Sequence, residues 1–159
     1  MPLLNETLLK NIISFQIPVA DLPEEDLIST WFGTAIKFIE DCIKNNGKIL
    51  IHCYHGVSRS ATILAAYLLK CGMDDTQIDF NEISDLNSVE DVITFMKGRR
   101  PIVCPNEGFV SQLRLWRAMD CQLDPSFKPY KMYQLNCIYQ KIRSTKILPS
   151  PVKSFFQVI

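Results

Sequence analysis

Cys53 and Arg59 lie six positions apart in the string HCYHGVSRS, and together they could carry out nucleophilic chemistry on a phosphate group. A cysteine thiolate is a strong nucleophile, and the pKa of the thiol falls at the start of a helix or beside an arginine. An arginine guanidinium binds two phosphate oxygens at once, which a lysine cannot do. The spacing therefore predicts a thiolate that attacks phosphorus while the guanidinium holds the oxygens.

The residues between this pair suit a loop that binds an anion. The apolar run 48–51 predicts a short buried strand, and a largely buried helix is expected from Arg59 to Lys70. A loop that joins a strand to a helix forms a nest of backbone amides at the positive end of the helix dipole. Gly56 allows a turn that a Cβ would hinder. The predicted phosphate-binding residues are Tyr54, His55, Gly56, Val57, Ser58 and Arg59.

Two neighbours of the loop have predicted supporting roles. Ser60 is expected to donate a hydrogen bond to the sulfur and so to ease departure of the thiolate in a second step. His52 is expected to organise the loop, because a preformed thiolate needs no general base. The alternative is that Cys53 is an ordinary buried thiol and the spacing arises by chance. The position between an apolar run and a helix favours the catalytic interpretation.

The elements that must position this loop are predicted from hydrophobic periodicity and from helix-capping residues. ISFQIPV at 13–19 predicts a second strand, and residues 73–87 predict an acidic loop. Ser88 and Asp91 resemble a capping box at the start of a helix. The predicted helices span 23–46, ending at Gly47, then 59–70, closed by Gly72, then 88–98, 107–120 and 130–143; the tail around residues 149–151 is expected to be loose.

The composition predicts an ordinary globular chain. It has 159 residues, of which 47% are hydrophobic and 21% charged, with a formal net charge of zero. A neutral chain lacks the basic surface expected of a nucleic-acid or anionic-membrane binder. The six cysteines form no CxxC pair, so we expect reduced thiols, no structural zinc, and a cytoplasmic or nuclear location. Neither a secretory leader nor a membrane span is expected.

The string HCYHGVSRSA resembles the signature of the cysteine-dependent protein phosphatases, in particular the dual-specificity branch. The segment IPVADLPEEDLISTWFGTAIKFIED is similar to the family's acid loop and following helix, and GRRPIVCPNEGFVSQLRLW is similar to its late Arg-Pro to Gly-Phe segment, so the resemblance covers about residues 12–120. It implies an α/β fold with a central sheet flanked by helices. It also implies hydrolysis of phosphotyrosine and phosphoserine or phosphothreonine in protein substrates through a cysteinyl phosphate, without a metal or organic cofactor.

The resemblance also implies roles for residues outside the loop. Asp21 matches the family's general acid, which protonates the leaving group; Asp26 is a competitor, and a surface or capping role is the alternative for Asp21. Asn106 matches an asparagine that supports the loop, although helix capping is an equally open interpretation. Cys104 takes a place where the family often has a small residue. Whether Cys53 pairs with another cysteine stays open.

The resemblance divides the chain into a catalytic domain at 1–121 and a helical extension with a loose tail at 122–159. The string LDPSFKPYKMYQLNCIYQKI resembles the subgroup of dual-specificity phosphatase twelve, whose members carry a separate zinc-binding domain that we do not expect in this chain. Only about twelve residues precede ISFQIPV, where the family has more strands, so we expect a sheet without its N-terminal strands. This keeps open an inactive shortened isoform or a non-catalytic phosphate-binding scaffold. An RNA 5′-phosphatase is a further alternative, suggested by His55-Gly56.

Overall fold

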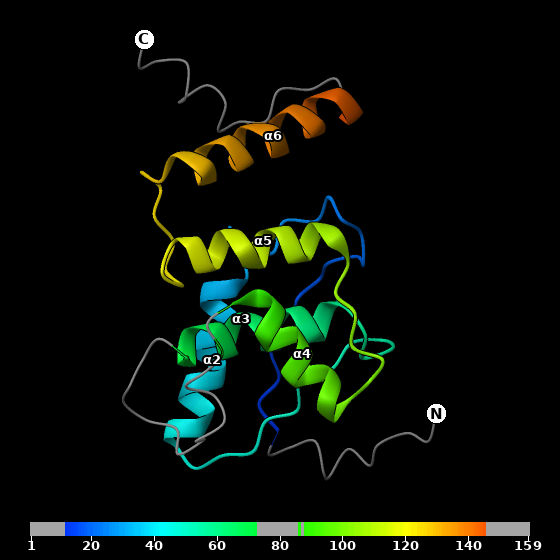
Figure 1. The fold of residues 1–159 in the computed structure, drawn as a ribbon, viewed down its shortest axis with the longest axis vertical. Coiled ribbons are helices and arrows are strands. Elements are labelled where there is room, and N and C mark those ends of the chain that lie inside the picture. Colours follow the sequence, from blue (N-terminus) through cyan, green and yellow to red (C-terminus); the bar gives the residue numbers. More distant parts are fainter. Residues whose placement is uncertain (1–11, 73–85, 87, 146–159) are drawn as a thin grey trace.

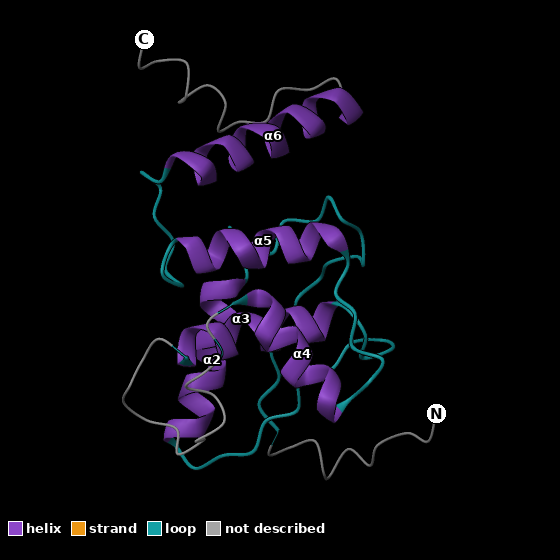
Figure 2. Cartoon of the chain, viewed as in Figure 1, coloured by secondary structure: helices purple, strands orange, loops and turns teal. Residues whose placement is uncertain are grey.

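The computed structural model describes residues 12–72, 86 and 88–145, and within them the chain consists of helices joined by loops (Figure 2). The predicted loop at 73–87 lies almost entirely outside these residues, as does the predicted loose tail. No helix in the described part is long and apolar enough to cross a bilayer. The helices are α2 (Phe32–Lys44), α3 (Arg59–Cys71), α4 (Val89–Arg99), α5 (Glu107–Ala118) and α6 (Lys128–Thr145).

Helix α3 forms the centre of the fold and begins at the predicted anion-binding loop. Nine of its 13 residues are buried, and it packs against α2, α4 and α5 (Figure 1). A helix that is apolar on most sides must be covered by neighbours on most sides. Gly72 is its C-cap, as predicted, and its amide donates to the carbonyl of Leu68. The start of α3 is therefore fixed within the core of the molecule.

The helices around α3 match the predicted periodicity, with two differences at their ends. Ser88 and Asp91 form the predicted capping box at the start of α4. The helix predicted from residue 23 begins only at Phe32, because residues 20–31 form turns that carry Asp21 to the loop. The C-cap of α2 is Asn45 rather than the predicted Gly47. The residue with a left-handed backbone conformation is Asn46, whose φ is 53°.

The two predicted strands, 13–19 and 48–51, are not strands in the described part of the chain. Half-buried and exposed side chains alternate over 48–51, whereas residues 13–16 are all exposed and only Ile17 and Val19 of the first segment are half-buried. Ile17, Val19, Ile49 and Ile51 pack against the core. A strand also needs a ladder of hydrogen bonds to a neighbour. The described residues form no such ladder here, and Val19 N–H donates instead to Ile17 O, two residues back, at 3.0 Å.

Helix α6 lies beyond α5, on the side away from α3 (Figure 1). Tyr130 is 3% exposed and joins α6 to the core cluster. The hydroxyl of Tyr133 donates to Asp26 Oδ1 at 3.1 Å, which ties the helix to the turn before α2. The boundary at residue 121, predicted between a catalytic domain and an extension, stays a prediction.

Candidate active site

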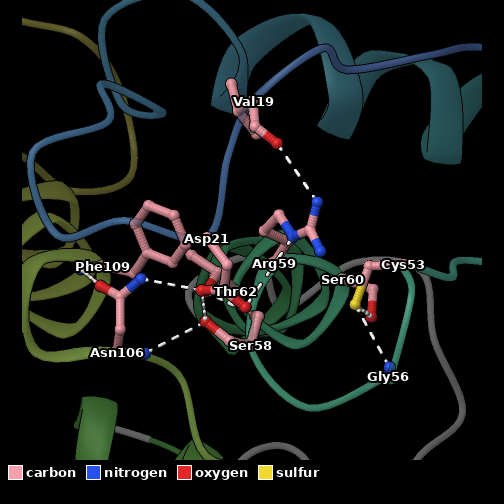
Figure 3. A network of polar contacts seen from close by, with 10 residues as sticks. All are labelled: Val19, Asp21, Cys53, Gly56, Ser58, Arg59, Ser60, Thr62, Asn106 and Phe109. Atoms are coloured by element: carbon pink, nitrogen blue, oxygen red, sulfur yellow. Dashed lines mark hydrogen bonds and ion pairs between the residues drawn. The ribbon is translucent and has the colours of Figure 1, made fainter.

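The thiol of Cys53 lies among hydrogen-bond donors that stabilise its ionised form. Its Sγ accepts from the backbone N–H of Gly56 at 3.2 Å and from the hydroxyl of Ser60 at 3.3 Å (Figure 3). Burial opposes ionisation, but the bonds from the Ser60 hydroxyl and from the amides of Ser60, Gly56 and Val57 outweigh it. They lower the pKa of Cys53 from 9.0 to about 6. About nine-tenths of this thiol is therefore ionised at pH 7.

Gly56 gives the loop its sharp turn. Its φ of +67° lies in the left-handed region that residues with a Cβ rarely adopt. A Cβ at this position would also lie 3.1 Å from Arg100 Nη2. The turn directs the amide of Gly56 toward the sulfur, so the predicted role of this glycine in shaping the loop agrees with its geometry.

Arg59 is the first residue of α3, and its guanidinium is held at one end. Nη1 donates to Val19 O at 3.3 Å, and Nε lies 3.8 Å from Asp21 Oδ2. Nε is buried and makes no hydrogen bond to the described residues. Because Val19 takes Nη1 and Nε is buried beside Asp21, Nη2 is the remaining guanidinium nitrogen for a contact with an oxyanion. In Figure 3, Arg59 lies between Asp21 on one side and Cys53 on the other.

Asp21 meets the loop through a compact cluster with Ser58 and Asn106 (Figure 3). Its Oδ1 accepts from the Ser58 hydroxyl at 2.6 Å and from Asn106 Nδ2 at 2.9 Å. The backbone amide of Asn106 donates in turn to Ser58 Oγ at 3.2 Å. Asn106 also caps α5, because its Oδ1 accepts from Phe109 N at 3.0 Å. Both interpretations left open for Asn106 are therefore seen in one side chain.

The segment that carries Asp21 is fixed to α5 by contacts that the sequence did not predict. Buried Gln112 accepts at Oε1 from the amides of Leu27 and Ile28, at 2.8 and 3.0 Å, and donates from Nε2 to Glu25 O at 2.7 Å. A Cβ on Gly108 would lie 2.0 Å from the carbonyl oxygen of Pro23. Two backbones thus approach closely enough to require glycine at this point.

The remaining predicted residues lie around this core. Asp26, the competitor for the acid, accepts from the amide of Ser29 at 3.1 Å and from Tyr133, so it supports a turn and α6. His52, Tyr54 and His55 are exposed, and the rings of Tyr54 and His55 meet edge to face with centroids 4.5 Å apart. The role of His52 stays a prediction.

Two further contacts on the loop were not predicted from the sequence. Arg100 donates to two loop carbonyls, and the hydroxyl of Thr62 donates to Ser58 O at 2.9 Å. Arg100 lies in the Gly-Arg-Arg-Pro string that is part of the resemblance. The string indicated that this segment matters to the family, but it did not indicate which residues Arg100 contacts. Among the described residues, no group of three or more histidine, cysteine, aspartate or glutamate side chains is placed to hold a metal.

A known protein family matches most of the sequence of this chain. The family model "Dual specificity phosphatase, catalytic domain" matches residues 3–119. Dual specificity protein phosphatase MPK-4 of Drosophila melanogaster is 37% identical over 143 residues, covering 90% of this chain and 33% of its own length. Human dual specificity protein phosphatase 12 is 32% identical over 133 residues, covering 84% of this chain and 35% of its own. The chain spans about a third of the length of the curated relatives it matches.

Solved structures agree with this assignment of the fold. The crystal structure of DUSP15 superposes with a TM-score of 0.59 and 34% identity, covering 77% of this chain and 66% of that one. The structure titled human tyrosine phosphatase-like serine/threonine/tyrosine-interacting protein gives a TM-score of 0.52 and 27% identity, covering 71% of this chain and 72% of that one. The helices and the loop described above are therefore arranged as in a dual-specificity phosphatase.

Proposed function

This chain belongs to the dual-specificity phosphatase family, and on that premise we propose that it hydrolyses phosphotyrosine and phosphoserine or phosphothreonine in proteins. The observation that carries the proposal is the environment of Cys53. Hydrogen bonds from Gly56 and Ser60 lower the pKa of this thiol to about 6, so a nucleophile exists at neutral pH without a base. Arg59 at the start of α3 supplies the positive charge that a phosphoryl group requires.

In the first step, a lone pair on Cys53 Sγ forms a bond to phosphorus as the bond from phosphorus to the leaving oxygen breaks. That oxygen takes a proton from Asp21 and departs as an alcohol or phenol. The Arg59 guanidinium and the loop amides bind the phosphoryl oxygens as charge develops on them. Asp21 Oδ1 already accepts two hydrogen bonds, so Oδ2 is the oxygen available to carry the proton.

In the second step, water attacks the cysteinyl phosphate and gives its proton to Asp21. The sulfur–phosphorus bond breaks, inorganic phosphate forms, and the Cys53 thiolate returns. The Ser60 hydroxyl, 3.3 Å from the sulfur, stabilises the negative charge that builds up there. The net reaction consumes one phosphoester and one water and leaves the protein unchanged.

A phosphatase assay on the purified chain tests this proposal. We expect release of phosphate from a phosphotyrosyl peptide and a phosphothreonyl peptide, with none in Cys53→Ser. The matched control is Cys42→Ser, because Cys42 is a half-buried thiol on α2 and should leave turnover unchanged. Asp21→Asn should lower kcat by about a hundredfold on an alkyl phosphate and less on an aryl phosphate with a good leaving group. Equal turnover in Cys53→Ser and the parent contradicts the proposal.

A phosphate-binding protein without turnover is the second candidate. It is favoured by the solved structure whose title describes a phosphatase-like interacting protein. Acid quenching during turnover of a radiolabelled substrate distinguishes the two functions, because an enzyme accumulates phosphate bound covalently to Cys53 and a pure binder does not.

We also propose that the chain belongs to the subgroup of dual-specificity phosphatase twelve. The tail sequence supports this, and so does the match to the human member of that subgroup.

We also propose that the segments 13–19 and 48–51 form part of the central sheet of the family. The alternating burial of residues 48–51 supports it, as do the contacts of Ile17 and Val19 with the core. So does a cavity of about 1070 Å³, which Ile49, Leu50 and Ile51 border together with apolar side chains of α2, α3 and α4. Amide hydrogen exchange tests the sheet. Slow exchange at residues 49–51 is expected of a strand ladder, and exchange at the rate of an unprotected loop contradicts it.

A further inference from the structure

The carbonyl groups of the phosphate-binding loop have partners on the side away from the sulfur. Val57 O accepts from the amide of Cys104 at 2.9 Å. Ser58 O accepts from both the amide and the hydroxyl of Thr62, at 2.8 and 2.9 Å. These bonds hold the carbonyls of the last two loop residues before α3. The carbonyls of His55 and Gly56 are both bound by one side chain.

That side chain is Arg100, the C-cap residue of α4. Its Nη2 donates to His55 O at 3.2 Å, and its Nε donates to Gly56 O at 3.3 Å. Bonds between a guanidinium and a carbonyl are charge-assisted and stronger than neutral ones. One rigid fork therefore holds two consecutive peptide groups of the loop.

The direction of those carbonyls decides the direction of the amides that face the sulfur. In a trans peptide, the C=O of one residue and the N–H of the next lie in one plane and point in opposite directions. The chain has no cis peptide among its described residues. Holding His55 O outward directs the amide of Gly56 inward, where it donates to Cys53 Sγ at 3.2 Å. Holding Gly56 O outward directs the amide of Val57 inward in the same way.

We propose that Arg100 is a positioning residue, which fixes the amides of Gly56 and Val57 toward the bound oxyanion by holding the opposite ends of the same two peptides. This inference rests on the proposed function, since it explains how that site is kept ready to bind phosphate. Gly56 adopts its left-handed φ without a steric cost, so the turn itself is open to this sequence. The bonds from Arg100 then fix the two peptides that the turn presents to the sulfur.

Vanadate binding by the full chain tests the proposal, measured by calorimetry so that turnover is not required. We expect Arg100→Ala to bind vanadate about tenfold more weakly than the parent, the scale of one charge-assisted hydrogen bond. Arg100→Lys should fall between them, because one ammonium can replace the charge but not both parallel bonds. Arg114→Ala is the matched control, since this exposed arginine pairs with Glu90 away from the loop.

Chemical rescue separates positioning from a general effect on folding. Guanidinium chloride at a low, non-denaturing concentration should restore most of the vanadate affinity of Arg100→Ala, whereas tetramethylammonium chloride, which has no N–H donors, should not. Unchanged affinity in Arg100→Ala overturns the proposal, and so does a loss that guanidinium fails to repair. If the parent binds vanadate but never releases phosphate from a substrate, the proposed function fails while the role of Arg100 is still decided.

Discussion

Substitution of Ser60 by alanine tests the electrostatic basis of the site. The Ser60 hydroxyl, 3.3 Å from Cys53 Sγ, makes the largest contribution among the hydrogen bonds that lower the pKa of this thiol. Alanine removes the donor and leaves the helical backbone of α3 unchanged. We expect the pKa of Cys53 to rise in this variant, because its thiolate loses its best partner while the burial that opposes ionisation persists.

The expected size of the pKa change follows from how the four hydrogen bonds share the lowering of the Cys53 pKa. The pKa falls from 9.0 to about 6 through four hydrogen bonds, and the Ser60 hydroxyl provides the largest part. Its loss should therefore raise the pKa by about one pH unit, from about 6 to about 7. At pH 6 the ionised fraction then falls from about one half to about one tenth. A thiolate of higher pKa is also more reactive, by roughly threefold per pH unit.

Alkylation by iodoacetamide between pH 5 and pH 9 measures both effects together. At pH 5 the parent should react roughly threefold faster than Ser60→Ala, and at pH 9 the variant should react roughly threefold faster, so the two curves cross at about pH 6.6. Cys53→Ser in each background gives the rate from the other five cysteines for subtraction. Two curves with the same midpoint, or a parent midpoint near 9, would refute the assignment of the hydrogen bonds to the thiolate.

The remaining predictions concern how the site is held. Gln112→Leu should lower the free energy of unfolding by about 2–4 kcal/mol in urea titrations, because the buried amides at 27–28 lose their acceptor; an unchanged midpoint would contradict it. Gly108→Ala should lower kcat but leave the rate of Cys53 alkylation unchanged, because the new Cβ displaces Pro23 and with it the segment that carries Asp21. The control is Gly98→Ala, since a Cβ at Gly98 has no neighbouring atom within 4 Å. Ser88→Ala should cost about 1 kcal/mol of stability by removing the cap of α4, and equal melting temperatures would exclude this.

The sequence was sufficient for the parts of the site that are local in the chain. The contacts of Cys53 with Gly56 and Ser60 span three and seven residues, within the loop and the first turn of α3, so a short string fixes them. The capping box at Ser88 is local in the same way. Such features follow from the preferences of neighbouring residues and from the dipole of the helix that begins there.

Asp21, Ser58 and Asn106 were predicted as site residues, but their contacts with one another were not, because these contacts join distant segments. Ser58 reaches Asp21 across 37 positions, and Asn106 reaches it across 85. Arg100 reaches the loop across 44 and 45 positions, and its string alone named no acceptor. The segments expected as strands lack a ladder among the described residues for a related reason. Apolar alternation indicates a half-buried extended segment, whereas a ladder also depends on which other segment lies beside it.

The attachment of Asp21 to both Ser58 and Asn106 has a consequence for the speed of the reaction. Enzymes that close a mobile lid over the substrate often have turnover rates that fall as the solvent becomes more viscous, because the lid must move through it. Here the acid is already joined to the floor of the site by bonds of 2.6 and 2.9 Å before any substrate arrives. On the proposed function, the acid needs no closing movement, so turnover in glycerol or sucrose should match turnover in plain buffer.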